Sequence, residues 1–437
     1  MPLNSNSALE SSSYVIKDIM KDFLPFAKKN FYFVNSLREE RQESAKVDFI
    51  KRHEDAGTLS VTSRGQNSPI IEQGTYQKYS AAALEIKAAK VFKEEDINNL
   101  LSTDKTNRRM AIQHIRDEQE DLLRKGIVTQ ELMAWSAFSR GEIKYSQYNP
   151  MAGVHFNPVT LSYPVQTRTK TDGAWWGEAT QTSVIARDDI DNAIDEFRAV
   201  AGNPPSEIWM TNQTLKTLRN TTQVSTAITN WYRSQNIGDV TPNNEQVAKA
   251  FNWPAIRIYD QSFLIEMTAR ATASSGSAVA VSITQSIASN TFGLSIGDIV
   301  YIGTNKDFLN GTYREKDVIV AIDHGNTITL RTLDNNIAVG DKIWARPTFM
   351  ANDSIILVDT SVENMIWGLA PFGINDDGTG ARWYGWQTQP FQMGEPNLAT
   401  YYRVWNSLIP IMFSPKRIMK FKVRDLVEEY AAGKIGG

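Results

Sequence analysis

The residues whose types and spacing could support chemistry begin with a G-x-S-x-G pentapeptide, Gly293 to Gly297, in which Ser295 holds the position of a nucleophile. Hydrolases that use this motif place a strand before the serine and a helix after it, which exposes the hydroxyl at a strained turn. Here the following residues, DIVYIG, have the pattern of a strand, and no supporting histidine and acid pair is indicated. The motif therefore favours a β-turn, with a hydrolase as the lesser alternative.

Carboxylates gather in one stretch of the chain, which contains Asp188, Asp189, Asp191, Asp195 and Glu196. Paired carboxylates can transfer protons, but acids in the first turn of a helix also complement its dipole. We expect Asp188 or Asp189 to cap a helix over residues 188–201, with the remaining acids solvated. Residues 375–380, NDDGTG, lack the spacing of a calcium loop and the lysine of a phosphate loop, which favours an exposed turn.

Metal and thiol chemistry have little support in the sequence. Cysteine is absent, which removes disulfides, thiolate ligands and cysteine nucleophiles. The four histidines, which are far apart and show no ligand-type pairing, are His53, His114, His155 and His324. We therefore predict no catalytic residue, no cofactor-binding residue, no metal site and no cofactor, and we expect a protein that is not an enzyme.

The composition is that of an ordinary globular protein, with 41% hydrophobic and 22% charged residues among 437. The net charge is −3, from 46 basic and 49 acidic residues, which disfavours a protein that grips nucleic acid through its phosphates. No apolar run approaches the roughly 18 residues of a membrane span, and no secretory leader is visible, so we expect a cytoplasmic product. The eleven tryptophans fit either a tryptophan-rich core or buried interfaces.

The elements that must position any site are unevenly distributed. Residues 1–55 contain an amphipathic helix and are typical of an arm, whereas residues 56–92 are polar and turn-rich, which predicts a long hairpin with little core of its own. The strongest helix is predicted over residues 107–140, with a stop at Gly141 and a possible weak point at Gly126. Its length, roughly 50 Å at about 1.5 Å per residue, indicates a spine rather than one member of a compact bundle.

The second half of the chain alternates helices with strands and then changes to strands alone. Strands are expected at residues 156–165, 206–211 and 255–259, with helices at 188–201 and around 247–251. Residues 272–346 contain five β-runs, which predicts a small all-β module that is inserted into an α/β domain and joined through the stretch ATASSGSA. Gly297-Asp298 and Gly340-Asp341 each precede one of these runs. Strand character resumes at residues 353–359 and 399–413.

The order of these elements resembles the lambda-type major capsid protein family, capsid protein E, of tailed bacteriophages. The resemblance is carried by RRMAIQHIRDEQEDLLRKGIVTQELMAWSAFSRGEIKY, with Glu131, Met133 and Ala134 at an E-x-M-A-like turn. It is also carried by Trp175 or Trp176 followed by Asp189-Ile190 and PPSEIWMT, and by IILVDTSVENMIWGLAPFG. ESAKVDFIKR and ALEIKAAKVFKEEDI match the arm and hairpin flanks more loosely. The likeness spans most of residues 30–425, and the departure from it is residues 272–346.

The resemblance implies an α+β, Hong Kong 97-like capsid fold. The expected parts are an N-terminal arm (1–55), an extended hairpin loop (56–92), a peripheral domain with the spine helix (93–186), an axial domain (187–271 and 347–373), the inserted β-domain (272–346) and a return to the peripheral domain (374–437). The implied role is a major capsid protein that assembles as pentamers and hexamers into an icosahedral head. Such a virion protein encloses double-stranded DNA without sequence-specific binding, and it is assembled in the host cytoplasm.

The resemblance also implies partners, which are a scaffolding protein, a portal and a decoration protein, with no membrane involved. Three alternatives stay open at this point: a cellular encapsulating shell that houses cargo enzymes, a β-domain hydrolase, and a nucleic-acid-binding protein. We expect the inserted β-domain to lie on the shell exterior, with a neutral insertion as the competing explanation.

Overall fold

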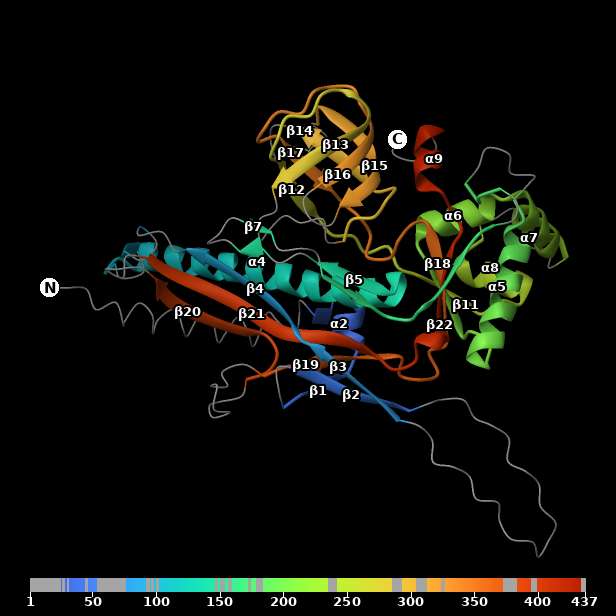
Figure 1. Cartoon of the computed structure of the whole chain (residues 1–437), viewed down its shortest axis with the longest axis horizontal. Helices are drawn as coiled ribbons and strands as arrows, with labels where there is room; N and C mark the ends of the chain where they lie inside the picture. Colours follow the sequence, from blue (N-terminus) through green and yellow to red (C-terminus); the bar gives the residue numbers. More distant parts are fainter. Residues whose placement is uncertain are drawn as a thin grey trace, which may run out of the picture. The chain divides into compact units, whose positions relative to one another are not determined.

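The structure is a computed structural model (Figure 1), and it describes residues 25, 28–29, 31–43, 46–52, 76–91, 95, 98–99, 102–145, 148–149, 154–155, 159–171, 174–177, 184–234, 242–284, 293–303, 313–323, 327–371, 383–393 and 399–433. The chain forms two compact units. Unit 1 comprises Met1–Gln130 and Met365–Phe413, and unit 2 comprises Glu131–Asn364 and Ser414–Gly437. Among the described residues, no helix is both long and apolar enough to cross a membrane.

Unit 1 is built on a five-stranded sheet in the order β1-β19-β21-β20, with β4 also paired to β21. Only β1 runs parallel to its neighbour, and the other pairs are antiparallel. The strands are β1 (Glu39–Arg41), β4 (Leu84–Val91), β19 (Met365–Leu369), β20 (Gln387–Met393) and β21 (Ala399–Met412). The long strand predicted over residues 399–413 is confirmed as β21, and it supplies the axis of this sheet.

The predicted spine helix is confirmed as α4 (Lys105–Trp135), which continues into the π-helical segment η1 (Ser136–Arg140) and ends at Gly141 with a left-handed φ of 68°. Within unit 1, its buried Leu122, Leu123 and Ile127 form a core with Trp386 and Val404 of the sheet. The helix runs through Gly126, where a Cβ would lie 2.3 Å from the Trp386 ring, so the glycine makes room for that side chain.

The hairpin differs in position from the prediction of residues 56–92. Its limbs are β2 (Lys46–Arg52) and β3 (Tyr76–Ala82), which pair with Lys46 opposite Ala82 and Arg52 opposite Tyr76. Residues 84–91 instead form β4, in which half-buried and exposed side chains alternate because one face covers the core of unit 1. Residues 53–75 lie outside the described part. Most of the predicted arm helix does too, while α2 (Tyr32–Ser36) buries Phe33 and Val34.

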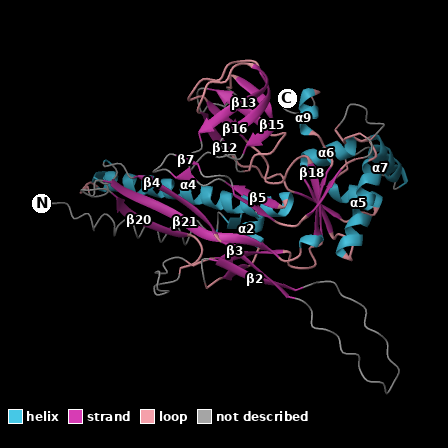
Figure 2. Cartoon of the chain, viewed as in Figure 1, coloured by secondary structure: helices cyan, strands magenta, loops and turns pink. Residues whose placement is uncertain are grey.

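Unit 2 is organised around a second five-stranded sheet, in the order β11-β10-β18-β22-β9, with helices gathered beside it (Figure 2). The outer pairs β10–β11 and β22–β9 are parallel, and the inner pairs are antiparallel. The strands are β9 (Gln166–Thr169), β10 (Glu207–Met210), β11 (Ala255–Ile258), β18 (Ser354–Val358) and β22 (Ile418–Lys422). The helices are α5 (Ala186–Ala201), α6 (Asn212–Asn220), α7 (Thr222–Ser234), α8 (Asn244–Phe251) and α9 (Leu426–Ala431). Smaller elements are β5 (Glu142–Tyr145), β6 (Tyr148–Asn149), β7 (Val154–His155), β8 (Val159–Ser162) and the 3-10 turn η4 (Pro415–Arg417).

The all-β segment of unit 2 is a closed barrel in the order β12-β13-β16-β15-β14-β17. Its strands are β12 (Ile265–Ala269), β13 (Gly276–Thr284), β14 (Ile299–Gly303), β15 (Glu315–Asp323), β16 (Thr327–Leu333) and β17 (Lys342–Ala345). The predicted module begins at residue 272, but β12 already belongs to the barrel because it closes the sheet against β17. ATASSGSA is not simply a linker either, since β13 begins at Gly276. Ile265 and Ala345 are paired, so the chain enters and leaves the barrel side by side.

Candidate functional site

The G-x-S-x-G pentapeptide forms a turn at the foot of the barrel, as predicted. The amide of Ser295 donates to Asp298 Oδ2 at 2.6 Å, and the amide of Asp298 donates to the Ser295 carbonyl at 3.1 Å. Gly293 and Gly297 have left-handed φ values of 95° and 93°, and β14 follows the turn directly. A strand in place of the helix leaves Ser295 without the geometry of a nucleophile elbow.

The same turn occurs a second time before β17, where the sequence repeats Gly-Asp. The amide of Ala338 donates to Asp341 Oδ2 at 2.8 Å, and Gly340 has a φ of 91°. In both turns a glycine accepts the left-handed conformation and the next aspartate accepts the amide at the start of the turn. The repeated dipeptide is therefore a structural device of the barrel rather than a chemical site.

The acidic stretch 188–196 contains one residue whose environment the sequence did not predict. The prediction that Asp188 or Asp189 caps the helix is wrong, because α5 begins at Ala186, and Ile185 at its N-cap makes no side-chain cap. Asp189 is instead buried, and its Oδ2 accepts from Lys170 Nζ at 2.5 Å and from Trp176 Nε1 at 2.9 Å. A carboxylate with a buried cation and an indole as donors is fully engaged, so it is not a free acid or base.

The other four acids are exposed or partly exposed and have ordinary partners. Asp188 accepts from Gln223, Asp191 from Trp253, Asp195 from Arg198, and Glu196 forms an ion pair with Arg168. Residues 375–380 lie outside the described residues. Within the described ranges, no group of three or more histidine or acidic side chains is arranged to hold a metal ion. These side chains therefore bring together no catalytic or metal-binding set.

The strand that continues from the hairpin is fixed to the spine helix by charge. Lys90 of β4 contacts Glu118 and lies 2.9 Å from Asp121 Oδ2, and Asp121 also accepts from Lys125 at 2.8 Å. Desolvation of the Lys90 ammonium lowers its pKa, but the two carboxylates outweigh this and raise the pKa of Lys90 above its ordinary value. The two lysines in turn lower the pKa of Asp121, against the opposing effect of desolvation. All of these side chains are partly exposed, so the network orients β4 more than it stabilises the fold.

In unit 2 an aromatic cluster joins the end of the spine helix to the central sheet. Trp209 of β10 stacks on Phe138 at a centroid distance of 4.9 Å and contacts Tyr259 at 4.8 Å. Trp135 packs edge-on against both Trp209 and Tyr259. Trp135 Nε1 donates to the buried Glu131 at 2.8 Å. The E-x-M-A-like stretch expected to form a turn lies instead within α4, and its Glu131 supplies the polar partner of this cluster.

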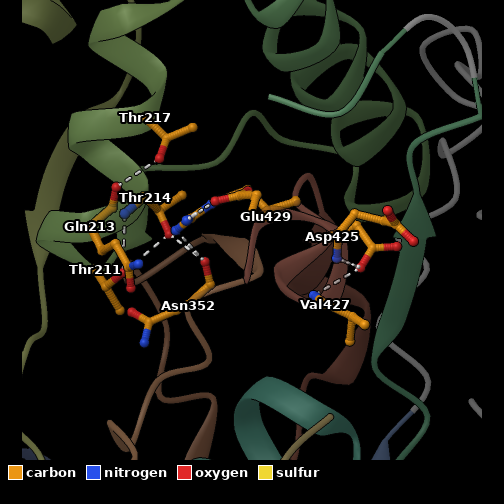
Figure 3. A network of polar contacts seen from close by, with 10 residues as sticks. Thr211, Gln213, Thr214, Thr217, Asn352, Asp425, Val427 and Glu429 are labelled. Carbon is orange, nitrogen blue, oxygen red and sulfur yellow. Dashed lines mark hydrogen bonds and ion pairs between the residues drawn. The ribbon is translucent and has the colours of Figure 1, made fainter. Parts of the chain in front are cut away.

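A buried ion pair between Arg424 and Glu429 joins the C-terminal helix α9 to the turn before β18 and to α6 (Figure 3). Arg424, which is 0% exposed, donates to both carboxylate oxygens of Glu429 at 2.9 and 2.5 Å. It also donates to the Asn352 carbonyl at 3.0 Å, which accepts the Thr214 hydroxyl at 2.8 Å as well. Gly177 lies against Glu429, because a Cβ there would be 1.9 Å from Oε1.

Sequence reasoning missed both buried ion pairs, Arg424 with Glu429 and Lys170 with Asp189. Arg424 and Glu429 stand in a mixed segment, RDLVEEY, where charged side chains look solvated, and Lys170 and Asp189 are 19 residues apart. Their one sequence signal is the nearby Trp176-Gly177 pair, in which a buried ring and a glycine touch the two carboxylates in question. The sequence singled out Trp176 and Asp189, both as parts of the family resemblance, but not their partners Lys170, Arg424 and Glu429.

In the described part of the chain, the hairpin β2–β3 leads into β4, the spine helix α4 packs on the sheet of unit 1, and a second sheet with its own helices forms unit 2. Residues 20–282, more than half of the chain, match the family described as phage major capsid protein E. The chain belongs to this family, and it is a capsid protein of the phage virion. The expected family, α+β fold class and shell role are confirmed.

Solved structures with a similar fold include a candidate capsid protein of a prophage in Escherichia coli CFT073, with 12% identity and a TM-score of 0.41 over 87% of this chain and 85% of that one. A phage-related protein from Bordetella bronchiseptica RB50 has 8% identity and a TM-score of 0.41, over 91% and 90%. The capsid of Myoviridae phage XM1 has 8% identity and a TM-score of 0.37, over 88% and 89%. No curated protein sequence matches the chain.

Proposed function

We propose that this capsid protein assembles as pentamers and hexamers into the icosahedral head that encloses the DNA of a tailed phage. The observation that supports this most is the hairpin β2–β3, which among the described strands pairs only within itself and leads directly into β4 of the unit 1 sheet. A two-stranded hairpin is marginally stable alone and gains stability by burying its surface on a neighbour. Repeated use of one such patch closes rings by rotation.

Removing the hairpin strands tests this role. We expect a chain in which residues 47–81 are replaced by two glycines to fold but to form no shells, because Lys46 and Ala82 are paired neighbours and β4 keeps its pairing with β21, while the surface of β2 and β3 is lost. The measurement is negative-stain electron microscopy together with circular dichroism of the soluble subunit. A matched control inserts the same two glycines after Asn203, in the exposed turn that follows α5. Normal particles from the deletion would contradict the proposal.

The proposal includes the partners that the sequence resemblance implies. A scaffolding protein would guide assembly in the host cytoplasm, a portal would occupy one vertex, and a decoration protein would bind the outside. The net charge of −3 suits an interior that holds packed DNA without gripping it. We infer that the chain has no catalytic activity, and the test is Ser295→Ala, which leaves shell formation and any hydrolase activity of purified particles unchanged.

The main rival keeps the fold and changes the contents, as in a cellular encapsulating shell. Particles purified from the natural host distinguish the two, because a phage head contains nuclease-protected DNA whereas an encapsulating shell contains cargo protein. Membership of the phage capsid family favours the first outcome.

The barrel is proposed to lie on the shell exterior, where it would reinforce capsomer contacts or bind an accessory protein. The support is its closed sheet with adjacent entry and exit at Ile265 and Ala345, which lets it project without disturbing the strands around it. Because the chain has no cysteine, a single thiol can report its position. Val339, which is 64% exposed in a barrel turn, is the site for that thiol.

We expect the Val339→Cys variant to react with a bulky maleimide in intact particles as completely as in disrupted ones. Ile343→Cys in β17 is the matched control: its position is 0% exposed, so it reacts only after denaturation. If the Val339→Cys thiol is protected in intact particles and reactive after disruption, the barrel is not exterior. The neutral-insertion alternative is then examined by replacing residues 265–345 with a short linker and measuring particle stability.

A further inference from the structure

The foot of the barrel is a loop, residues 293–298, that packs closely against the rest of unit 2. A Cβ at Gly293 would lie 2.7 Å from Leu132 Cδ2 and 2.8 Å from Phe263 Cζ, and one at Gly297 would lie 2.6 Å from Leu426 Cβ. The two glycines therefore let the loop approach the end of α4 on one side and α9 on the other. The Tyr430 hydroxyl of α9 adds a hydrogen bond of 3.1 Å to the Lys316 carbonyl of β15.

Arg140 holds this loop from the end of the π-helical segment. Its Nη1 donates to the Leu294 carbonyl at 3.2 Å and its Nη2 to the Gly293 carbonyl at 3.1 Å. Both acceptors are uncharged, so carboxylates nearby must balance the guanidinium. Desolvation lowers the pKa of Arg140, while Asp298, Asp353 and Glu142 oppose that effect. π-Helical turns are rare, and they occur frequently at functional sites.

Asp298 is the titratable group within the loop. It accepts the Ser295 amide, and it faces Arg140 from η1 and Asp353 from the turn before β18. Lys420 of β22 also belongs to this cluster, where burial lowers its pKa and Asp353, Arg140, Lys422 and Glu142 are its charged neighbours. Burial raises the pKa of Asp298 to about 7, against the opposing effects of the Ser295 amide and Arg140.

We propose that loop 293–298, Arg140 and Asp298 form a pH-responsive latch that docks the barrel on the end of the spine helix. The latch is closed when Asp298 is protonated, because the desolvation of a charged Asp298 beside Asp353 outweighs its attraction to Arg140, and Asp353 and Glu142 still balance the guanidinium. It loosens when Asp298 is charged. Arg140 is a positioning residue that joins the two sides through main-chain carbonyls. The inference concerns unit 2 alone and holds wherever the barrel lies on the particle.

The sign of the pH effect follows from proton binding. With the latch open, the Asp298 carboxyl is in water and has its ordinary pKa of 3.8, whereas in the docked loop the pKa is about 7. Between pH 3.8 and about pH 7, the docked state therefore binds more protons than the open state. Docking is strongest below about pH 4 and weakens as pH rises through 7. Full application of this shift gives about a 30-fold change in docking between pH 5.5 and 8, and about tenfold is expected because Asp298 keeps partial exposure to solvent.

Hydrogen exchange followed by mass spectrometry of the full chain, as particles and as subunits, tests the latch at pH 5.5 and 8. After correction for intrinsic exchange rates, residues 293–303 and 426–431 should lose about tenfold protection at pH 8. Residues 354–358 of β18, which are all buried, should not change. The Asp298→Asn variant should stay protected at both values. Asp323→Asn, an exposed acid on β15, is the matched control and should behave as the unmodified chain.

Arg140 variants test the other half of the latch. Arg140→Met should lose protection in the same two segments at both pH values, because the two carbonyls lose their donor. Arg140→Lys keeps a charge with a single donor nitrogen and should give intermediate protection, which keeps the test informative if the methionine variant does not fold. A pH response that persists in Asp298→Asn, or its absence in the unmodified chain, overturns the proposal.

Discussion

Replacing Arg424 with methionine should lower the free energy of unfolding of unit 2 by about 3 to 5 kcal/mol. The guanidinium is 0% exposed and donates to both oxygens of Glu429, which is itself 5% exposed. Methionine fills similar space but leaves a buried carboxylate without its cation, and that uncompensated charge is the main cost. Urea denaturation of the unassembled subunit, followed by far-ultraviolet circular dichroism, measures the change.

The matched control removes both charges. Arg424→Met combined with Glu429→Leu should recover most of the lost stability, because a buried ion pair replaced by apolar residues is often close to neutral. The Asn352 carbonyl keeps the Thr214 hydroxyl as a donor in this double variant. Gly177→Ala should resemble the single variant, since its methyl group displaces the Glu429 carboxylate. A double variant as unstable as Arg424→Met would show that packing, rather than charge, accounts for the loss.

Replacing Trp209 with alanine should cost about 3 to 5 kcal/mol as well, through lost burial and the cavity that remains. Trp209 is 2% exposed and contacts Trp135, Phe138 and Tyr259, so its ring is the centre of the aromatic cluster. Without it, the end of the spine helix loses its stacking surface on β10. The same urea denaturation measures the effect, and subunits of this variant should assemble poorly.

Two further measurements test whether the loss in Trp209→Ala comes from its burial and its stacking on Phe138. Trp383→Ala, at a position that is 51% exposed, should change the free energy of unfolding by less than about 0.5 kcal/mol. A cycle with Phe138→Ala should show a coupling of about 0.5 to 1.5 kcal/mol between the two stacked rings. Additive losses in that cycle would mean that the two rings contribute separately, and that the stacking geometry adds nothing to their burial.

The elements with a strong period could be predicted from the sequence. The spine helix, the strand over residues 399–413 and the β-runs of the barrel all follow from alternation or helical spacing, because these patterns depend on neighbours in the chain. Gly141 ends the spine helix as expected, and Gly202 ends α5 in the same way, both with left-handed φ values, since few other residues accept that conformation without cost. The resemblance of this element order to a known family then indicated the role of the protein.

Tertiary structure alone decided which strands pair and which charges are buried. The first hairpin limb lies at residues 46–52, outside the predicted hairpin, because pairing depends on a partner more than 20 residues away. β12 closes the barrel through β17, about 75 residues later in the chain, so its pattern could not show where the barrel begins. The division into peripheral, axial and inserted domains stays a prediction from the resemblance.

The sequence by itself determined the absence of cysteine chemistry, the near-neutral charge, the periodic elements and, through their order, the capsid family. What only the folded chain decided is the environment of single side chains, such as Asp189 beside Lys170, Arg424 beside Glu429 and Asp298 beneath the barrel. The physical reason is that periodicity is a local property of the chain. Burial and charge compensation depend on residues that meet only when distant segments pack together.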